Sequence, residues 1–467
     1  MIKNLCVIKN IRDLKNKKIH FIGIGGISMS AMAQILKSNK IYVQGSDLSE
    51  SDEVKILRKK GITIFNNHSE NNMSNIDVVV YTSAIKEDNT ELRFAIEHNL
   101  IILKRAELLG LISKEYKNVI AIAGSHGKTT ATAMISEIFV NAGLKPTIHI
   151  GGKNNLIKSN YKIGNKKYFI TEACEYKDNY LYLKPDVAVI LNIDSDHLDY
   201  FKTLDGVKNS FKNFANLTTD GGVVFSCLDD VNSDFLRYYD NNSTFGITSK
   251  KAEIKATKIK EFAPGRFSFN VIFCGYNLGK IKLNIFGKHN IYNALASILV
   301  GLTFDIDFSI IKYTLENFSG VSRRTEYIGQ INSANVFHDY AHHPKQIEKM
   351  IEMGRELISN KGKLYVVFEP HTFSRTKYLI DDFALSLSKS DEIYLAPVYS
   401  AREDESEGSS SNELKNVIKK HNKNIQIFSD YFEILNTLNR FVMADDIVLI
   451  LGAGTIEELA RMINKPF

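Results

Sequence analysis

The residues with the clearest chemical potential form a glycine-rich loop at 124–130, which reads GSHGKTT. An apolar, β-branched run at 119–123 precedes it, and a helical pattern at 128–142 follows it. Glycine amides can curl around phosphate oxygens, the helix N-terminus adds its positive end, lysine contributes charge and threonine can ligate Mg²⁺. Ile122 stands where the first glycine of the usual GxxxxGK pattern would be, so the loop is a shortened variant. We expect it to bind the ATP phosphates through Gly124, Ser125, His126, Gly127, Lys128, Thr129 and Thr130.

Acidic side chains and an imidazole follow two further expected strands. Glu172 comes directly after the strand pattern at 168–171, and Asp196-His197-Leu198-Asp199 follows the one at 187–193. The carboxyl ends of parallel strands share one edge of a sheet, so these groups can converge on a metal held by phosphate. Read singly, each is more often a cap or an ordinary loop residue. Glu172 is the better Mg²⁺ ligand because this ion prefers oxygen, and Glu175 and Asp178 are alternatives.

A second glycine cluster near the amino end, GIGGISMS at 23–30, follows an expected strand and opens a helix. Asp47 closes the next strand, which completes a pattern typical of dinucleotide sites. Ser28 occupies the position of the third glycine, which weakens the interpretation as a nicotinamide-cofactor site. Binding of a nucleotide diphosphate at the helix N-terminus remains compatible with the pattern. A tight turn and a helix cap are the structural alternatives.

Histidines and an arginine gather in the last third, in HDYAHHP at 338–344 and EPHTFSR at 369–375. Zinc is disfavoured because the HxxxHH spacing lies on a proline-bounded loop without a cysteine nearby. An aspartate there can bind ribose hydroxyls, and Arg375 can pair with phosphate or carboxylate. In FGKHNIYNALA at 286–296, Asn290 or Asn293 can present an amide to a base or simply cap a helix.

The elements that must position these residues follow a βαβ rhythm. The first set of strands is expected at 19–24, 41–43, 76–81 and 100–103, and a second set starts at 118–123. The second set continues at 168–171, 187–193 and 222–225, with short antiparallel strands between 255 and 285. A third set is expected at 335–338, 364–368, 392–395 and 447–451. This alternation predicts an α/β fold with mostly parallel sheets.

Composition narrows the class of protein. A chain of 467 residues should form two or three domains, and 44% hydrophobic with 24% charged residues is typical of a soluble globular protein. The net charge of +6 is small and dispersed, so nucleic acid is not implied. Cys6, Cys174, Cys227 and Cys274 are too sparse for a disulfide framework. No apolar run is long enough for membrane insertion or resembles an export signal, so we expect a cytoplasmic protein.

Taken in this order, the motifs resemble the Mur ligase family over nearly the whole chain. Besides those already given, the resemblance rests on NIDSDHLDYF at 192–201 and GVSRR at 320–324. It implies three α/β domains: a Rossmann-like UDP-sugar-binding domain at 1–114, a central P-loop ATPase domain with a parallel sheet at 115–319, and a Rossmann-like C-terminal domain for the amino acid and part of ATP at 320–467.

The resemblance also implies roles for single residues. UDP-sugar binding would fall to Gly23, Gly25, Gly26, Ser28, Met29, Asp47 and Ser83. ATP would be bound by the loop at 124–130 together with Asn290, Arg324 and Asp339. The metal ligands would be Thr129, Glu172 and His197, and the amino-acid site would comprise Tyr340, His342, His371 and Arg375. The catalytic set would be Lys128, His197, Glu172, His126 and Arg375.

The implied reaction is ATP-dependent ligation of L-alanine to UDP-N-acetylmuramate through an acyl-phosphate, with Mg²⁺ or alternatively Mn²⁺ as cofactor. The base that accepts the alanine proton is left open among His197, His126 and a neighbouring carboxylate, and so is carbamylation of Lys212. Relatives typically read EADESD where this chain has Cys174 and Tyr176, and Thr372 stands where they often carry arginine. The partners are the three substrates, with a monomer or homodimer expected. The alternatives are a sibling ligase that attaches a peptide, an NAD-dependent oxidoreductase and a non-catalytic nucleotide-binding regulator.

Overall fold

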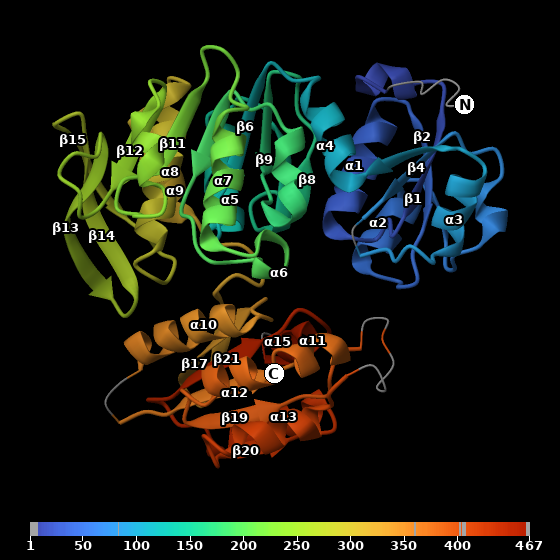
Figure 1. Cartoon of the computed structure of the whole chain (residues 1–467). Coiled ribbons are helices and arrows are strands. Elements are labelled where there is room, and N and C mark those ends of the chain that lie inside the picture. The colour runs from blue at the N-terminus through green and yellow to red at the C-terminus, as the bar shows by residue number, and fades with distance from the viewer. Residues whose placement is uncertain (1–7, 83, 359–360, 401–402, 404–407, 464–467) are drawn as a thin grey trace. The chain divides into compact units, whose positions relative to one another are not determined.

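The computed structural model describes residues 8–82, 84–358, 361–400, 403 and 408–463. They form three sheets with helices packed on their faces, which confirms the expected α/β class (Figure 1). The chain divides into two compact units. The first unit comprises Met1–Lys260, Phe267–Asn284 and Lys288–Ser319, and the second comprises Glu261–Arg266, Ile285–Gly287 and Gly320–Phe467.

The amino-terminal sheet has the strand order β3-β2-β1-β4-β5, with every neighbouring pair parallel. The order in which the strands are added to the sheet reverses between β1 and β4, which creates the crevice where such sheets bind ligands. The expected strands are present, and β3 is an addition that the sequence did not reveal. The strands are β1 (Lys18–Ile22), β2 (Tyr42–Ser46), β3 (Thr63–Phe65), β4 (Val78–Tyr81) and β5 (Ile101–Lys104). The helices are α1 (Ile27–Ser38), α2 (Asp52–Lys59), α3 (Thr90–Glu97) and α4 (Arg105–Ser113), with 3₁₀ turns η1 (Ile11–Leu14) and η2 (Glu70–Met73).

The second sheet has the order β15-β14-β13-β12-β11-β10-β6-β9-β7-β8. Its central strand β6 (Asn118–Ala123) is parallel to both β9 (Tyr168–Glu172) and β10 (Val187–Ile190). The carboxyl ends of these three strands therefore share one edge. Five helices belong to this part: α5 (Lys128–Asn141), α6 (Leu198–Phe201), α7 (Leu204–Ala215), α8 (Asn290–Thr303) and α9 (Phe308–Asn317).

The margins of this sheet differ in part from the expectation. The remaining strands are β7 (Thr147–Asn154), β8 (Ser159–Lys162), β11 (Val223–Cys227), β12 (Asn242–Gly246), β13 (Ile254–Ala263), β14 (Arg266–Phe273) and β15 (Tyr276–Lys282), with the turns η3 (Tyr176–Tyr182) and η4 (Asp234–Tyr238). The pair β14–β15 is antiparallel as expected, whereas β13 pairs with β12 in parallel. The strand expected at 187–193 ends at Ile190 because the chain then turns toward the glycine-rich loop.

The sheet of the second unit has the order β16-β17-β21-β18-β19-β20, in which only the β16–β17 pair is antiparallel. Buried β-branched and aromatic side chains fill both faces, as expected for a sheet covered by helices. The strands are β16 (Glu326–Ile331), β17 (Ala334–Asp339), β18 (Leu364–Phe368), β19 (Glu392–Leu395), β20 (Ile425–Ile427) and β21 (Ile447–Leu451). The helices are α10 (Pro344–Leu357), α11 (Phe373–Tyr378), α12 (Ile380–Leu387), α13 (Ser411–Ile418), α14 (Tyr431–Phe441) and α15 (Glu457–Ile463).

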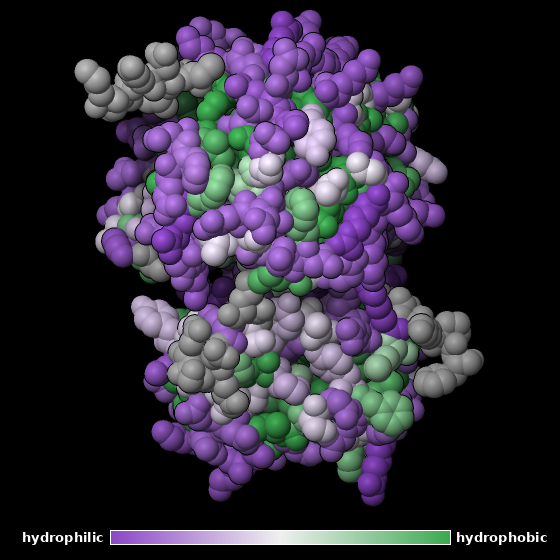
Figure 2. Space-filling model, turned by 90° about the vertical axis from the view of Figure 1, so that its right-hand side faces the viewer, coloured by the Kyte–Doolittle hydropathy of each residue, from purple (hydrophilic) through white to green (hydrophobic). Residues whose placement is uncertain are grey.

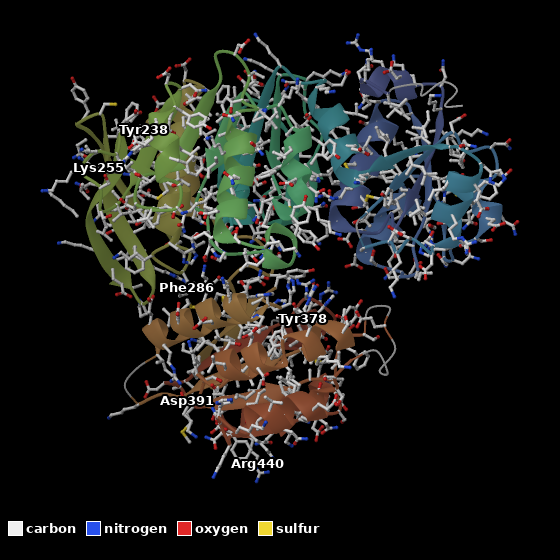
Figure 3. The ribbon with its side chains drawn as sticks, in the orientation of Figure 1. Tyr238, Lys255, Phe286, Tyr378, Asp391 and Arg440 are labelled. Carbon is white, nitrogen blue, oxygen red and sulfur yellow. The ribbon has the colours of Figure 1, made fainter. Side chains whose placement is uncertain are left out.

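Two short segments that precede Gly320 in the sequence belong to this second unit. Phe286, labelled in Figure 3, lies edge-on to Phe337 with ring centroids 4.7 Å apart. The guanidinium of Arg266 lies 4.7 Å from the same Phe286 ring, and Gly287 N–H donates to the Gly265 carbonyl at 2.9 Å. The two segments therefore complete one corner of the second unit's core.

The face drawn in Figure 2 is predominantly hydrophilic, with small scattered apolar patches. Among the helices of the described residues, none combines the length and the apolar character needed to cross a bilayer. Cys174, Cys227 and Cys274 are free thiols, and Cys6 lies outside the described residues.

Candidate active site

The glycine-rich loop connects β6 to α5, as the sequence indicated. Gly124 and Gly127 have φ angles of 141° and 85°, in a region that favours glycine. A Cβ atom at Gly127 would lie 2.5 Å from Oδ1 of Asn293, well inside van der Waals contact. Both the backbone conformation and the neighbouring α8 helix therefore require glycine at this position.

The segment after β10 holds the loop in place through four hydrogen bonds. Ser125 N–H donates to the Asn192 carbonyl at 3.0 Å, and His126 N–H donates to the Asn192 side-chain oxygen at 2.8 Å. The Asn192 amide returns a bond to the His126 carbonyl at 3.0 Å, and Asp194 N–H donates to the Ser125 hydroxyl at 2.8 Å. Sequence reasoning missed Asn192, although it opens the NIDSDHLDYF motif. The loop is thus pre-formed, which reduces the entropy cost of binding.

Lys128 is the first residue of α5 and lies over the loop. Its ammonium donates to the Gly124 and Ser125 carbonyls and to Oε1 of Glu175 at 2.9 Å. Burial by itself lowers the pKa of Lys128, but the surrounding acidic groups, Glu175 foremost and Glu172 among them, together outweigh that effect, and the pKa lies above its ordinary value. Lys128 is therefore a fixed positive charge at the loop.

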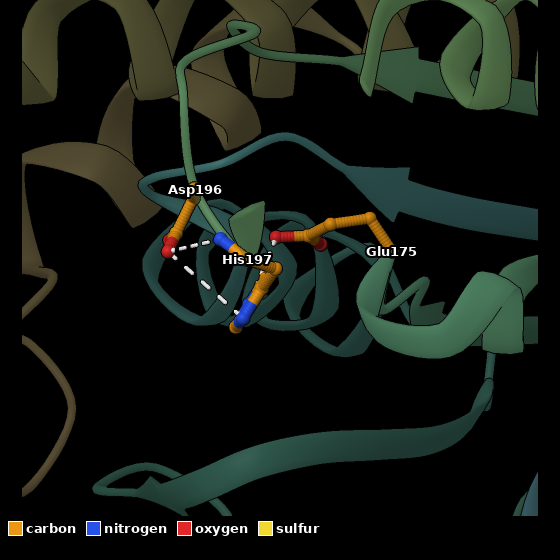
Figure 4. Close-up of side chains that lie close together, drawn as sticks. All are labelled: Glu175, Asp196 and His197. Atoms are coloured by element: carbon orange, nitrogen blue, oxygen red, sulfur yellow. Dashed lines mark hydrogen bonds and ion pairs between the residues drawn. The ribbon is translucent and has the colours of Figure 1, made fainter. Parts of the chain in front are cut away.

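Glu175, Asp196 and His197 form a group whose ligand atoms all lie within 4.8 Å of one another (Figure 4). His197 Nε2 lies 3.8 Å from Oε1 of Glu175, and His197 Nδ1 lies 3.9 Å from Oδ1 of Asp196. The Glu175 side chain is only 1% exposed, and among the described residues its Oε2 atom has no hydrogen-bond partner. A buried oxygen of this kind requires a further partner. The donor set of two carboxylates and one imidazole is able to hold a divalent cation.

Unusual backbone conformations create this group. His197 has a φ of 54°, and Lys177 and Asp178 have φ angles of 53° and 57°, which is the left-handed region for non-glycine residues. The reversal at 177–178 kinks η3, so the chain folds back just after Glu175. Strain of about 1–3 kcal/mol per such residue persists when the surrounding structure enforces it, and it concentrates at functional sites.

Glu172, the metal ligand expected from the sequence, is not a member of this group. Its Oε1 atom accepts the Gly151 N–H of β7 at 2.6 Å. Asp178, an alternative, accepts hydrogen bonds from the Tyr200 hydroxyl at 2.7 Å and from Ser210. Thr129 lies buried in the first turn of α5, and Lys212 is exposed in the last turn of α7.

Asn290 and Asn293 both lie in the first turn of α8, beside the glycine-rich loop. Asn290 is 5% exposed, and its side-chain oxygen accepts a bond from the Asn293 amide at 2.8 Å. The N-cap of α8 is His289, which makes no side-chain cap hydrogen bond. His126 Nε2 lies 3.2 Å from Oδ2 of Asp194 at the other side of the loop.

The amino-terminal glycine turn lies between β1 and α1. Gly23 has a φ of 78°, and a Cβ at Gly25 would lie 2.9 Å from Oδ2 of Asp47, which accepts the Gly25 N–H at the same distance. Asp47 therefore braces the turn through the Gly25 N–H, and the N-cap of the following helix α2 is Ser51. Gly26 is exposed, Ser28 is half-buried and Met29 is buried in the core. Ser83 lies outside the described residues.

In the second unit, four of the expected amino-acid-site residues lie together beyond the ends of β17 and β18. His342 and His371 have ring centroids 5.9 Å apart, and His371 Nδ1 is 3.4 Å from Nη1 of Arg375. The rings of Tyr340 and His342 are 5.1 Å apart. Burial, together with the Arg375 charge, lowers the pKa of His371 to about 4 and that of His342 to about 3. Both imidazoles are neutral at pH 7.

Asp339 and Arg324 lie next to this cluster. The Asp339 carboxylate accepts N–H groups of Thr325 at 2.7 Å and Ala341 at 2.8 Å, and the Arg324 guanidinium lies 5.5 Å from the Tyr340 ring. Burial raises the pKa of Asp339, and the Arg324 charge acts in the opposite direction.

Parallel sheets of this order, with a phosphate-type loop at the end of a central strand, define a nucleotide-binding α/β protein. Family models confirm and narrow this class: the Mur ligase family catalytic domain matches residues 18–117, the Mur ligase middle domain 122–301, and the Mur ligase glutamate ligase domain 323–454. The chain belongs to the Mur ligase family.

Relatives match along almost the full chain. The UDP-N-acetylmuramate–L-alanine ligase of Caldanaerobacter subterraneus subsp. tengcongensis is 43% identical over 449 residues, which is 96% of this chain and 97% of that protein. The enzyme of the same name from Clostridium tetani is 43% identical over 451 residues, covering 96% and 98%. The crystal structure of the UDP-N-acetylmuramate-alanine ligase of Thermotoga maritima is similar with a TM-score of 0.79 at 28% identity, covering 96% of this chain and 98% of that one.

Proposed function

We propose that this chain joins L-alanine to the lactyl carboxylate of UDP-N-acetylmuramate, giving UDP-N-acetylmuramoyl-L-alanine, ADP and phosphate, a step of peptidoglycan precursor synthesis. The observation that carries the proposal is near-full-length identity of 43% with relatives of that activity, combined with a pre-formed phosphate loop under Lys128. ATP is the co-substrate. The reaction uses cytoplasmic substrates, so the proposed location is the cytoplasm, with the chain acting as a monomer or homodimer.

The chemistry follows from the poor electrophilicity of a carboxylate. The γ-phosphoryl group of ATP is transferred to a carboxylate oxygen, and ADP leaves. The amine of alanine then attacks the carbonyl carbon, the bond to the phosphate oxygen breaks, and inorganic phosphate leaves. The amides of the 124–130 loop and the fixed charge of Lys128 bind and orient the phosphates. The candidates for the base that takes the amine proton are His126, His197 and a neighbouring carboxylate.

We further propose that Mg²⁺, or alternatively Mn²⁺, is held by Glu175, Asp196 and His197, with Thr129 beside them, rather than by Glu172. The buried, unpartnered Oε2 of Glu175 supports this choice of carboxylate, because Oε1 of Glu172 already accepts the Gly151 N–H. When bound, the ion neutralises charge on the transferring phosphoryl group.

Paired variants test the choice of carboxylate. Glu175→Gln should raise the Mg²⁺ concentration for half-maximal activity at least tenfold, since a charged ligand is lost. Glu172→Gln, the matched control, should leave it within about threefold. The reverse order of effects would refute the assignment.

The residues of the second unit complete the proposal. Arg375 pairs with the carboxylate of alanine, while Tyr340, His342 and His371 form the wall of the amino-acid site. Asp339 and Arg324 face the ribose and phosphates of ATP, and Asn290 faces the adenine. In the first unit, Gly23, Gly25, Gly26 and Ser28 approach the diphosphate of the UDP-sugar.

Phosphate release tests the activity directly. The purified chain is mixed with ATP, Mg²⁺ and UDP-N-acetylmuramate, and phosphate is measured with and without L-alanine, glycine, L-serine or a tripeptide. Phosphate release that depends on L-alanine, with a UDP-muramoyl-alanine product identified by mass spectrometry, is the expected result. Preference for the tripeptide would indicate a sibling ligase, and turnover without any amine dependence would contradict the proposal.

A further inference from the structure

Four hydrogen bonds form a chain that starts at Arg105, passes through Ser28 of the amino-terminal glycine turn and His149, and ends in strand β9 of the central sheet. Arg105, the first residue of α4, places Nη1 3.2 Å from the Ser28 hydroxyl oxygen. Ser28 Oγ lies 2.9 Å from Nε2 of His149 in β7, and His149 Nδ1 lies 2.9 Å from the Thr171 hydroxyl. The Thr171 hydroxyl lies 3.1 Å from the carbonyl oxygen of Glu172.

The chemistry of these groups fixes the direction of every bond. The Thr171 hydroxyl must donate to the Glu172 carbonyl, which has no proton, so it accepts from His149 Nδ1–H. His149 is 3% exposed, and burial, together with the Arg105 charge, lowers its pKa to about 3. The ring is therefore neutral, its Nε2 accepts the Ser28 proton, and a lone pair of Ser28 faces Arg105.

Arg105 is the charged end of this chain of bonds. The Ser28 hydroxyl uses one of its five N–H groups, and among the described residues no carboxylate lies within ion-pair distance of its guanidinium. By contrast, the Lys128 ammonium is paired with Glu175 at 2.9 Å. A half-buried guanidinium oriented in this way is suited to an anionic ligand, because its fork matches two oxygens of a carboxylate.

The chain of hydrogen bonds leads from Arg105 toward the edge of the central sheet that carries the phosphate loop. Its last side chain, Thr171, belongs to β9, whose carboxyl end shares one edge with the end of β6, where the phosphate loop begins. Arg105 is thus joined to that edge through Ser28 and His149. The diphosphate of the UDP-sugar has the amides of the glycine turn as donors, whereas the lactyl carboxylate must reach the phosphate loop.

We propose that Arg105 binds the lactyl carboxylate of UDP-N-acetylmuramate and that Ser28 and His149 position its guanidinium. The inference rests on the proposed function. Arg105 would hold the nucleophilic carboxylate for phosphoryl transfer, and it would also discriminate against UDP-sugars that lack this group. No sequence motif indicates Arg105 or His149, because they lie 77 and 121 positions from Ser28.

Binding of two UDP-sugars to the full-length chain tests the proposal. UDP-N-acetylmuramate carries both the diphosphate and the carboxylate, whereas UDP-N-acetylglucosamine carries only the diphosphate. Arg105→Met should weaken binding of the first by about tenfold to a hundredfold, the loss expected for a charge-assisted hydrogen bond, and leave binding of the second unchanged. Ser28→Ala should weaken binding of the first by a smaller factor, since the guanidinium keeps its charge but loses its orientation.

Controls separate binding from folding. Arg93→Met removes an exposed arginine of α3 and should change neither affinity. Arg105→Lys keeps the positive charge and the start of α4, so it replaces Arg105→Met as the test variant if thermal unfolding shows that Arg105→Met is unstable. Arg105→Lys should lose affinity for UDP-N-acetylmuramate but not for UDP-N-acetylglucosamine. Equal weakening of both UDP-sugars would assign Arg105 to the diphosphate and overturn the proposal, as would no weakening of either. If the unmutated chain fails to bind UDP-N-acetylmuramate, the proposed function itself falls.

Discussion

Gly127 offers a quantitative test of how the phosphate loop is built. Its φ of 85° costs a residue with a side chain about 1–2 kcal/mol, and the alanine Cβ would lie 2.5 Å from Oδ1 of Asn293. Relieving that overlap must shift α8 or the loop, at a cost of about 1–3 kcal/mol for overpacking. Gly127→Ala should therefore lower the free energy of unfolding by about 2–5 kcal/mol. It should also raise the KM for ATP, since the shifted amides no longer match the phosphates.

Gly143 supplies the matched control. It follows the same helix α5 with a φ of 74°, but no atom lies within 4 Å of a Cβ built there. Gly143→Ala should cost only the backbone strain of about 1–2 kcal/mol and leave the KM for ATP unchanged. Urea unfolding and steady-state ATP kinetics measure both quantities.

A double-mutant cycle with Asn293→Ala separates the cost of the steric overlap with Asn293 from the cost of the backbone strain at position 127. In that background Gly127→Ala should cost about as little as Gly143→Ala, because the clashing oxygen has gone. The reasoning would be refuted if Gly127→Ala and Gly143→Ala were equally destabilising, or if Asn293→Ala left the cost of Gly127→Ala undiminished.

Three further outcomes are expected. Lys128→Met should abolish L-alanine-dependent phosphate release in the colorimetric assay. If the variant kept a tenth of the activity, the proposed role of the Lys128 charge at the ATP phosphates would be excluded. Glu137 is buried, accepts the Asn154 amide at 2.8 Å and has a pKa raised by burial to about 7. Between its unfolded pKa of 4.5 and 7 the folded chain holds a proton that the unfolded chain lacks, so stability falls as pH rises through this window. Glu137→Gln should therefore stabilise the chain by about 2–3 kcal/mol at pH 8 and by little at pH 4.5 in urea unfolding. Arg375→Met should raise the KM for L-alanine at least tenfold with the KM for ATP within about twofold, and equal changes in both would contradict its pairing with the alanine carboxylate.

Features encoded within one stretch of sequence could be predicted. The run from β6 through the glycine-rich loop into α5 is correct nearly to the residue, because glycine spacing and the change of period are local signals. The start of α8 at Asn290 follows from the same kind of signal. The strand ends that share one edge with the loop were also predicted, since parallel topology dictates them.

Features that depend on backbone reversal or on distant packing could not be predicted. Spacing after a strand favoured Glu172 as the metal ligand, but the left-handed residues Lys177 and Asp178 turn the chain so that Glu175 meets Lys128. Nothing in a local pattern indicates that lysine and aspartate will adopt this conformation. Asn192, Arg105 and His149 gain their roles through hydrogen bonds to residues 66, 77 and 121 positions away, respectively.

The small segments around Arg266 and Phe286 have a consequence for modular exchange. Because they lie in the core of the second unit, that unit is not one contiguous stretch of the gene. If the segment that begins at Gly320 were replaced by that of a relative, Phe286 of this chain would pack against the relative's side chains instead of the Phe337 ring, whose centroid lies 4.7 Å away. Recombination between relatives should therefore succeed only when three separate stretches travel together.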